Sequence, residues 1–189
     1  MRQKVKIIMA LVVLPTLLAA FSPYAVKAQI WTQVNTDGFG DPNNTYIRTM
    51  SVFDGNLYAG TRNAATGCKV WEYESFANWT QVNTDGFGNP NNTYATSMGV
   101  AFGGLWVGTR NGATGCEVWF YDGSSWAQLI SDGFGDPNNG MAASLALFEG
   151  NLYVGTSNEI TGIEIWKFDG TNWVQVNTDG FGDVNNKHT

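Results

Sequence analysis

The sequence predicts an all-β fold built from repeated four-stranded antiparallel units. The string WTQVNTDGFGDPNN returns three times in slightly altered form, and a second string of the type VFDGNLYAGTRNAATGCKVWEY follows each of the first three copies. The copies begin at Trp31, Trp79, Trp126 and Trp173, at spacings of 48, 47 and 47 residues. A period of this length, with short β-rich segments, is typical of folds in which each repeat forms one small sheet.

Four short strands are expected in the first repeat, at residues 49–53, 57–62, 68–73 and 79–83. The turn between the first two contains Asp-Gly and Gly-Asn pairs, which tolerate the positive φ that hairpins require. Two longer connections, 63–67 and 84–92, follow the second and fourth strands. We therefore predict full repeats at 31–78, 79–125 and 126–172, and a partial copy at 173–189.

The first 28 residues have the features of a signal peptide. Arg2, Lys4 and Lys6 precede an apolar run at 7–21. Cleavage after Ala28 would place small or medium residues at the usual −3 and −1 positions before the cleaved bond. An uncleaved anchor is the alternative. Cleavage would leave a repeat domain at 29–189 that is secreted, in an extracellular or periplasmic location.

The charge of that domain restricts its partners. Six cationic side chains would remain against sixteen anionic ones, because four of the ten Lys and Arg residues lie in the first 28. Such a chain cannot neutralise many phosphates, so we expect no nucleic-acid partner. No further apolar stretch approaches the about 20 residues of a membrane-spanning helix, so we expect no membrane span after signal cleavage.

The repeat elements resemble those of secreted bacterial and archaeal β-propeller proteins, loosely of the Asp-box, kelch or tachylectin type. The resemblance is carried by LYVGT at 152–156, by EVW at 117–119, and by the YDG..W turn that ends at Trp126. It covers the chain from Trp31 onward. It implies a β-propeller-like array with three full four-stranded blades plus a terminal strand. A β-solenoid is the alternative.

Catalysis is not expected from these residues. The loose likeness to sialidase propellers would imply a cluster of arginines and a tyrosine nucleophile, but only Arg48, Arg62 and Arg110 follow the signal segment. Two of them occupy equivalent positions of different repeats. The one histidine, His188, lies in the terminal copy, so no Ser-His or Cys-His pair can form on the full repeats. We predict a protein that is not an enzyme.

The cysteines and tryptophans are expected to serve the core. Cys68 and Cys116 occupy the same position in neighbouring repeats, which should lie too far apart for a disulfide, so we expect buried thiols. The recurring tryptophans could form a sugar-stacking ladder, but packing between blades is the favoured interpretation. They are Trp71, Trp79, Trp106, Trp119, Trp126, Trp166 and Trp173.

Candidate binding residues lie in the two longer loops, because loops held on a rigid scaffold usually carry binding. Oxygen-rich side chains at Asp37, Asp41 and Asn43 could hold calcium, and the second repeat should bind it least because Asn89 replaces an aspartate. A loop that only satisfies its own hydrogen bonds is the alternative. The full candidate set is Asp37, Asp41, Asn43, Arg62, Asn63, Asp85, Asn91, Arg110, Asn111, Asp132, Asp136, Asn138 and Asn158.

Two functions emerge as hypotheses. The first is an extracellular binding module, lectin-like, with one quasi-equivalent site per blade for a glycan or an extracellular protein. The first two sites should bind alike through Arg62 and Arg110, and the third differently, because it carries Ser157 and Glu159. The second hypothesis is a scaffold that assembles into rings or filaments through its open ends.

Self-association is expected in either case. Three blades are fewer than the about four to eight of a closed propeller. The chain also carries the same strand at both ends of the array, at 31–35 and 173–177. We therefore predict a homo-oligomer, most simply a dimer that closes a six-bladed ring.

Overall fold

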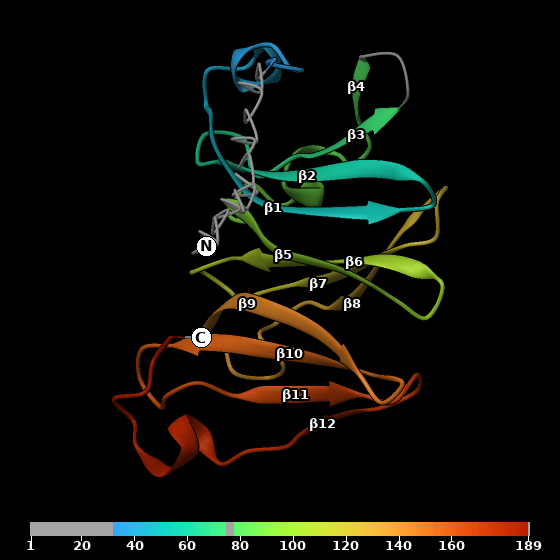
Figure 1. The fold of residues 1–189 in the computed structure, drawn as a ribbon. Coiled ribbons are helices and arrows are strands. Elements are labelled where there is room, and N and C mark those ends of the chain that lie inside the picture. The colour runs from blue at the N-terminus through green and yellow to red at the C-terminus, as the bar shows by residue number, and fades with distance from the viewer. Residues whose placement is uncertain (1–31, 75–77, 189) are drawn as a thin grey trace, which may run out of the picture. The chain divides into compact units, whose positions relative to one another are not determined.

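A computed structural model of the chain describes residues 32–74 and 78–188. The predicted signal peptide lies outside the described residues, and the repeats belong to one unit, Gln33–Thr189. The described part contains twelve strands joined in one antiparallel sheet and three short 3₁₀ turns, which confirms an all-β fold (Figure 1). The sheet is not closed, because its strand order ends at β12 on one side and at β4 on the other. No helix in the described part is long and apolar enough to cross a membrane.

The strands form three groups of four, each an antiparallel meander in chain order. The first repeat contains β1 (Asn44–Phe53), β2 (Asn56–Asn63), β3 (Val70–Glu74) and β4 (Asn78–Gln81). The second contains β5 (Tyr94–Ala101), β6 (Gly104–Arg110), β7 (Val118–Tyr121) and β8 (Trp126–Ile130). The third contains β9 (Asn139–Phe148), β10 (Asn151–Asn158), β11 (Ile165–Phe168) and β12 (Trp173–Gln175).

Two strands begin two or more residues away from their predicted first residue. Strand β1 begins five residues earlier than the expected residue 49, because Asn44, Tyr46 and Ile47 also pair with the end of β2, across two register shifts. Strand β3 begins at Val70 because the backbone N–H of Cys68 donates to the carbonyl of Asn92 in the following loop instead. In both cases hydrogen bonds near the loops, which residue patterns do not report, move the boundary.

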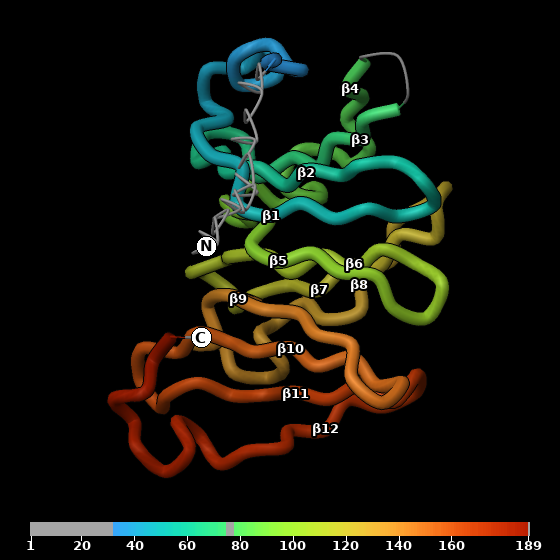
Figure 2. The backbone as a smooth tube through the Cα atoms, viewed as in Figure 1, coloured from blue at the N-terminus to red at the C-terminus, as the bar shows by residue number. Residues whose placement is uncertain are grey.

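Neighbouring repeats meet at their first and second strands, here called the inner strands, as the backbone tube in Figure 2 shows. Only one residue pair links β2 to β5, Arg62 with Tyr94, and only one links β6 to β9. The approach is close, because a Cβ atom added to Gly60 would lie 2.7 Å from that of Ala95. A side chain on the glycine would therefore push the two repeats apart.

The core lies between adjacent repeats. Side chains from β2 and β6, including Tyr58 and Leu105, form one buried cluster, and Trp106 with Val154 belongs to the next. Trp106 is only 1% exposed, which confirms its predicted role in the core. Both cysteines are buried and unbridged, also as predicted.

The connections fall into short hairpins and longer loops that lie on opposite sides of the strands (Figure 1). The β1–β2 hairpin turns at Asp54 and Gly55 with φ of 48° and 82°, which confirms the predicted positive-φ turn. The longer loops contact each other, since the N–H of Gly86 donates to the carbonyl of Cys68 at 2.8 Å. These loops contain most of the candidate residues.

Candidate functional site

Each repeat contains a fully buried asparagine at the end of its second strand, and the sequence had marked all three as candidate ligands: Asn63, Asn111 and Asn158. The side-chain oxygen of Asn111 accepts hydrogen bonds from the backbone N–H groups of Ala113 and Thr114, at 3.0 and 3.1 Å. Its amide nitrogen donates to Asn92 at 3.1 Å. The side chain thus closes its own loop and also bonds to the end of the preceding long loop, and the same bonds recur in the other two repeats.

A second buried asparagine, which sequence reasoning missed, ends each long loop: Asn44, Asn92 and Asn139. Asn92 donates to the carbonyl of Gly86 at 2.9 Å and to the Glu117 carboxylate at 2.7 Å, while its oxygen accepts from Asn111. The loop that leaves one repeat is thereby bonded to the next. The recurrence of an Asn-Asn pair at the end of every long loop was the available signal.

Asp41, a predicted calcium ligand, is bound to a cation of the protein itself. Its carboxylate accepts from the Lys69 ammonium group at 2.7 Å and from Asn63 at 2.9 Å. The hydrogen bond from Lys69, followed by that from the Asn43 backbone, lowers the pKa of Asp41 to about 2. The calcium hypothesis does not fit this loop, because Lys69 already supplies the positive charge that calcium would bring. Within the described residues no group of three or more His, Cys, Asp or Glu side chains could hold a metal ion.

The remaining loop carboxylates and amides mostly bond to their own loop. Asp37 accepts from Gln33 at 2.8 Å, and Asp85 accepts from Gln81 at 2.9 Å and lies 3.5 Å from Lys69. Asp132 accepts from the N–H of Gly135. Exposed amides also fold back, since Asn43 and Asn138 donate to Asp41 and Asp136 respectively, and Asn91 donates its backbone N–H to Asn89. These contacts support the self-bonded connector, the alternative that the sequence had left open.

Phenylalanine in the long loop packs between two tryptophans of the repeat that follows. Phe87 stacks on Trp119 at 4.7 Å between ring centroids and meets Trp126 edge-on at 5.0 Å. The equivalent stacks are 4.8 Å for Phe39 on Trp71 and 4.9 Å for Phe134 on Trp166. The tryptophans that might have formed a sugar ladder are therefore used to join repeats.

The arginines are arranged differently from the sequence expectation. Arg62 and Arg110 come from equivalent positions of different repeats, yet both lie over the ring of Tyr94, at 5.2 and 5.4 Å, and Arg48 lies at 5.9 Å from the same ring. The Arg62–Tyr94 strand pair brings the neighbouring repeats, and with them these two arginines, together at this point. Arg62 and Arg110 therefore belong to one cluster around Tyr94.

An open pocket lies beside this cluster, with a volume of about 280 Å³. Its lining includes Arg110 and Asn138, together with Ser157 and Glu159 of the third repeat. Ser157 and Glu159, which distinguish the third repeat in sequence, thus lie in the lining of a pocket that also contains Arg110. Glu159 also lies 3.1 Å from His188.

No protein-family model matches the chain, and a search of curated proteins finds no significant match. The fold and the loop geometry therefore carry the functional argument.

Proposed function

We propose that the chain is an exported, non-enzymatic scaffold of β-propeller type, whose three repeats are blades and whose C-terminal loop receives another copy of the chain. The four-stranded meanders, linked at their inner strands, support the blade interpretation. The loop carboxylates and amides bond within their own loop or to the next blade, which favours a structural role over the lectin-like one.

The observation that carries this proposal is that Phe181 is exposed to solvent, although its loop has the conformation of a loop that joins two repeats. The turn after β12, Asp179–Gly182, has the backbone of the two corresponding turns: Phe181 has φ 56° and ψ 32°, against 58° and 30° for Phe87. Phe181 is nevertheless 60% exposed and has no aromatic partner within the described residues, whereas Phe87 is buried between two tryptophans. The loop is half of a junction, already in its bound shape.

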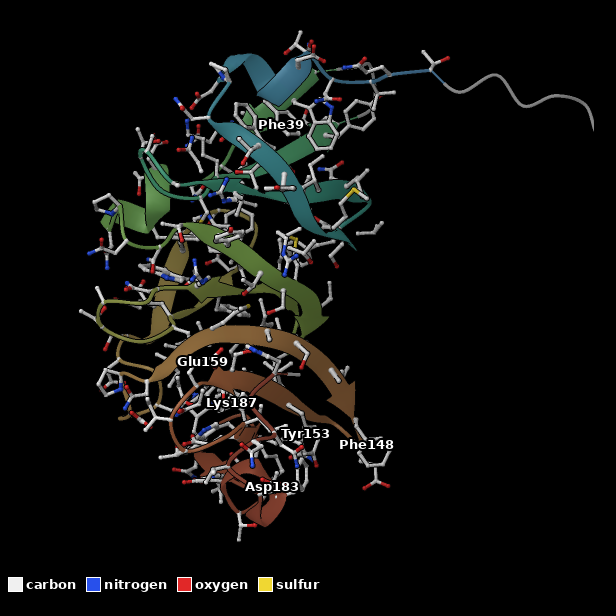
Figure 3. The ribbon with its side chains drawn as sticks, turned by 90° about the vertical axis from the view of Figure 1, so that its left-hand side faces the viewer. Phe39, Phe148, Tyr153, Glu159, Asp183 and Lys187 are labelled. Carbon is white, nitrogen blue, oxygen red and sulfur yellow. The ribbon has the colours of Figure 1, made fainter. Side chains whose placement is uncertain are left out.

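The first blade of a second copy fits this half-junction. It carries Trp71 and Trp79 for the phenylalanine, and Lys69 for the aspartate that follows it. The free loop has an aspartate there, Asp183, which can pair with Lys69 as Asp41 does. Segment 173–186 is identical to 31–44 at 12 of 14 positions. Phe39 and Asp183 lie at opposite ends of the array (Figure 3).

For the loop after β12 to bind the first blade of a partner, it must displace the partner's own segment 36–44, which already occupies that place. Since the two segments are nearly identical, the exchange itself changes little free energy. The favourable free energy of association comes instead from burying apolar surface on β1. Ile47 of this strand is 48% exposed, whereas the equivalent Ala95 and Ala142 are fully buried under the preceding blade. Ile47 is larger than alanine, so the new junction should be looser than the internal ones and association reversible. Two copies joined at both ends would give six blades, within the about four to eight of closed propellers.

Analytical ultracentrifugation of residues 29–189 from 1 to about 200 µM tests this proposal. A reversible oligomer that is weakened at least tenfold by Phe181→Ser supports it. The control is Ile160→Ser, which also removes an exposed apolar side chain, 65% exposed, but from a loop tip outside the junction. A monomer over the whole range, or equal effects of the two substitutions, would refute it.

A further inference from the structure

Half of the cations beyond the predicted signal peptide gather around one ring. Arg48 on β1, Arg62 on β2 and Arg110 on β6 all lie within 6 Å of the centre of the Tyr94 ring. Each contact is a cation–π interaction, and together they place three positive charges at the junction of the first two repeats. The chain as a whole is acidic, so this local concentration of positive charge is unusual within it.

In the part of the chain that the structure describes, none of these three arginines forms an ion pair with a carboxylate. Lys69 and Lys187, by contrast, each have a carboxylate within 4.0 Å. Arg62 donates from Nη1 to the Thr45 hydroxyl at 2.8 Å, while its Nε is buried and has no hydrogen-bond partner. Like charges held together repel, and Arg48 and Arg110 are exposed, so an anion bound to them would relieve the repulsion.

The arrangement occurs once. At the junction of the second and third repeats, Met141 stands in the place of Tyr94 and Ser157 in the place of Arg110. Glu159 adds a negative charge to the neighbouring pocket. An anion is therefore favoured at the Tyr94 end of this surface and disfavoured at the Glu159 end.

We propose that Arg48, Arg62 and Arg110 bind an oxyanion group, such as a carboxylate or a sulfate, on a ligand of low total charge. Guanidinium forks match the paired oxygens of such groups and hold them bidentately. The low total charge follows from the rest of the chain, whose excess of carboxylates would repel a long polyanion. This site does not depend on the assembly proposed above, because it lies within one chain.

Titration of ¹⁵N-labelled protein with sodium sulfate, glucuronate and glucose, followed by the NMR signal of the Arg62 Nε–H, tests the proposal. We expect sulfate or glucuronate, but not glucose, to shift this signal in a saturable way. Binding of both anions at similar strength would identify the oxyanion itself as the determinant. Binding of glucuronate alone would identify a carboxylate ligand.

Variants separate a site from general charge attraction. Arg62→Gln and Arg110→Gln should each weaken anion binding at least tenfold while thermal unfolding stays cooperative. Lys167→Gln removes the same charge from β11 and should leave the affinity unchanged. Absence of saturable shifts up to 50 mM of either anion, or equal weakening by all three substitutions, would overturn the proposal.

Discussion

Asn89 donates a hydrogen bond to Glu117 at 3.1 Å, and these two residues together replace the Asp41–Lys69 ion pair of the first repeat. From the first repeat to the second the aspartate and the lysine have both changed, so a donor still faces an acceptor there. In the third repeat Asp136 instead accepts from Asn158, and Glu164 accepts from Asn139. The substitution of Asn89, interpreted from sequence as a weakened calcium ligand, is thus explained by its partner 28 residues later.

This pairing predicts the outcome of a charge reversal. Lys69→Glu should lower the free energy of unfolding by about 2 kcal/mol or more, because it places a carboxylate beside Asp41 and Asp85 in a buried position. Adding Asp41→Asn should recover more than half of the loss, since the pair then copies Asn89 and Glu117, and Trp71 gains the acceptor that Trp119 already has. Urea unfolding of both variants and of Asp41→Asn alone measures this. A double variant no more stable than Lys69→Glu would contradict the pairing.

The buried asparagines should matter more for stability than their exposed neighbours. Asn111→Ala leaves two backbone N–H groups without their partner and removes one of the two hydrogen bonds to the oxygen of Asn92, so we expect a loss of about 2–4 kcal/mol. Asn91→Ala, at an exposed position of the adjoining loop, should change stability by less than about 0.5 kcal/mol. Both are measured by denaturant unfolding. Similar losses for the two variants would show that Asn111 is not the closing residue of its loop.

Much of the fold follows from the sequence, and the junctions do not. Repeated apolar segments and the Asp54–Gly55 turn predict strands and hairpins, because both are local. The position of Tyr94 between two arginines depends on a single strand pair between repeats, and no local pattern reports such a pair. The amide side chains recur at the same loop positions in every repeat, but this composition suits both a ligand site and a self-bonded connector.

Close contact between the two long loops predicts a matched pair of glycine substitutions. Gly67 and Gly88 both have positive φ, 100° and 89°, so alanine is strained at either position by about 1 kcal/mol. A Cβ atom on Gly67 would also lie 2.5 Å from the Cα of Gly86, whereas nothing lies within 4 Å at Gly88. We therefore expect Gly67→Ala to lower the thermal unfolding midpoint clearly more than Gly88→Ala. Equal midpoints would mean that the loops do not touch in solution.

Acid should weaken the contact between Asp41 and Lys69, which joins segment 36–44 to the first repeat, within a defined pH range. The pKa of Asp41 is lowered in the fold to about 2 from an ordinary value of 3.8, so its carboxylate stabilises the folded state above about pH 4. That contribution is lost as the pH falls toward 2. Asp41→Asn should be less stable than the parent at pH 7, and the gap should narrow between pH 4 and 2. Thermal unfolding at several pH values checks this, with Asp54→Asn in an exposed hairpin as the control. A gap that stays constant with pH would rule out the ionised Asp41 as its source.

The exchange between copies is tested most directly by zero-length cross-linking of a mixture of ¹⁴N- and ¹⁵N-labelled protein at high concentration. Lys69 lies 2.7 Å from Asp41 within one chain, and the proposed junction brings it to Asp183 of another. The account predicts a cross-linked peptide pair that joins Lys69 to Asp183 and contains one light and one heavy chain. Detection of Lys69 linked only to Asp41 and Asp85 of the same chain, in the associated fraction, would contradict it.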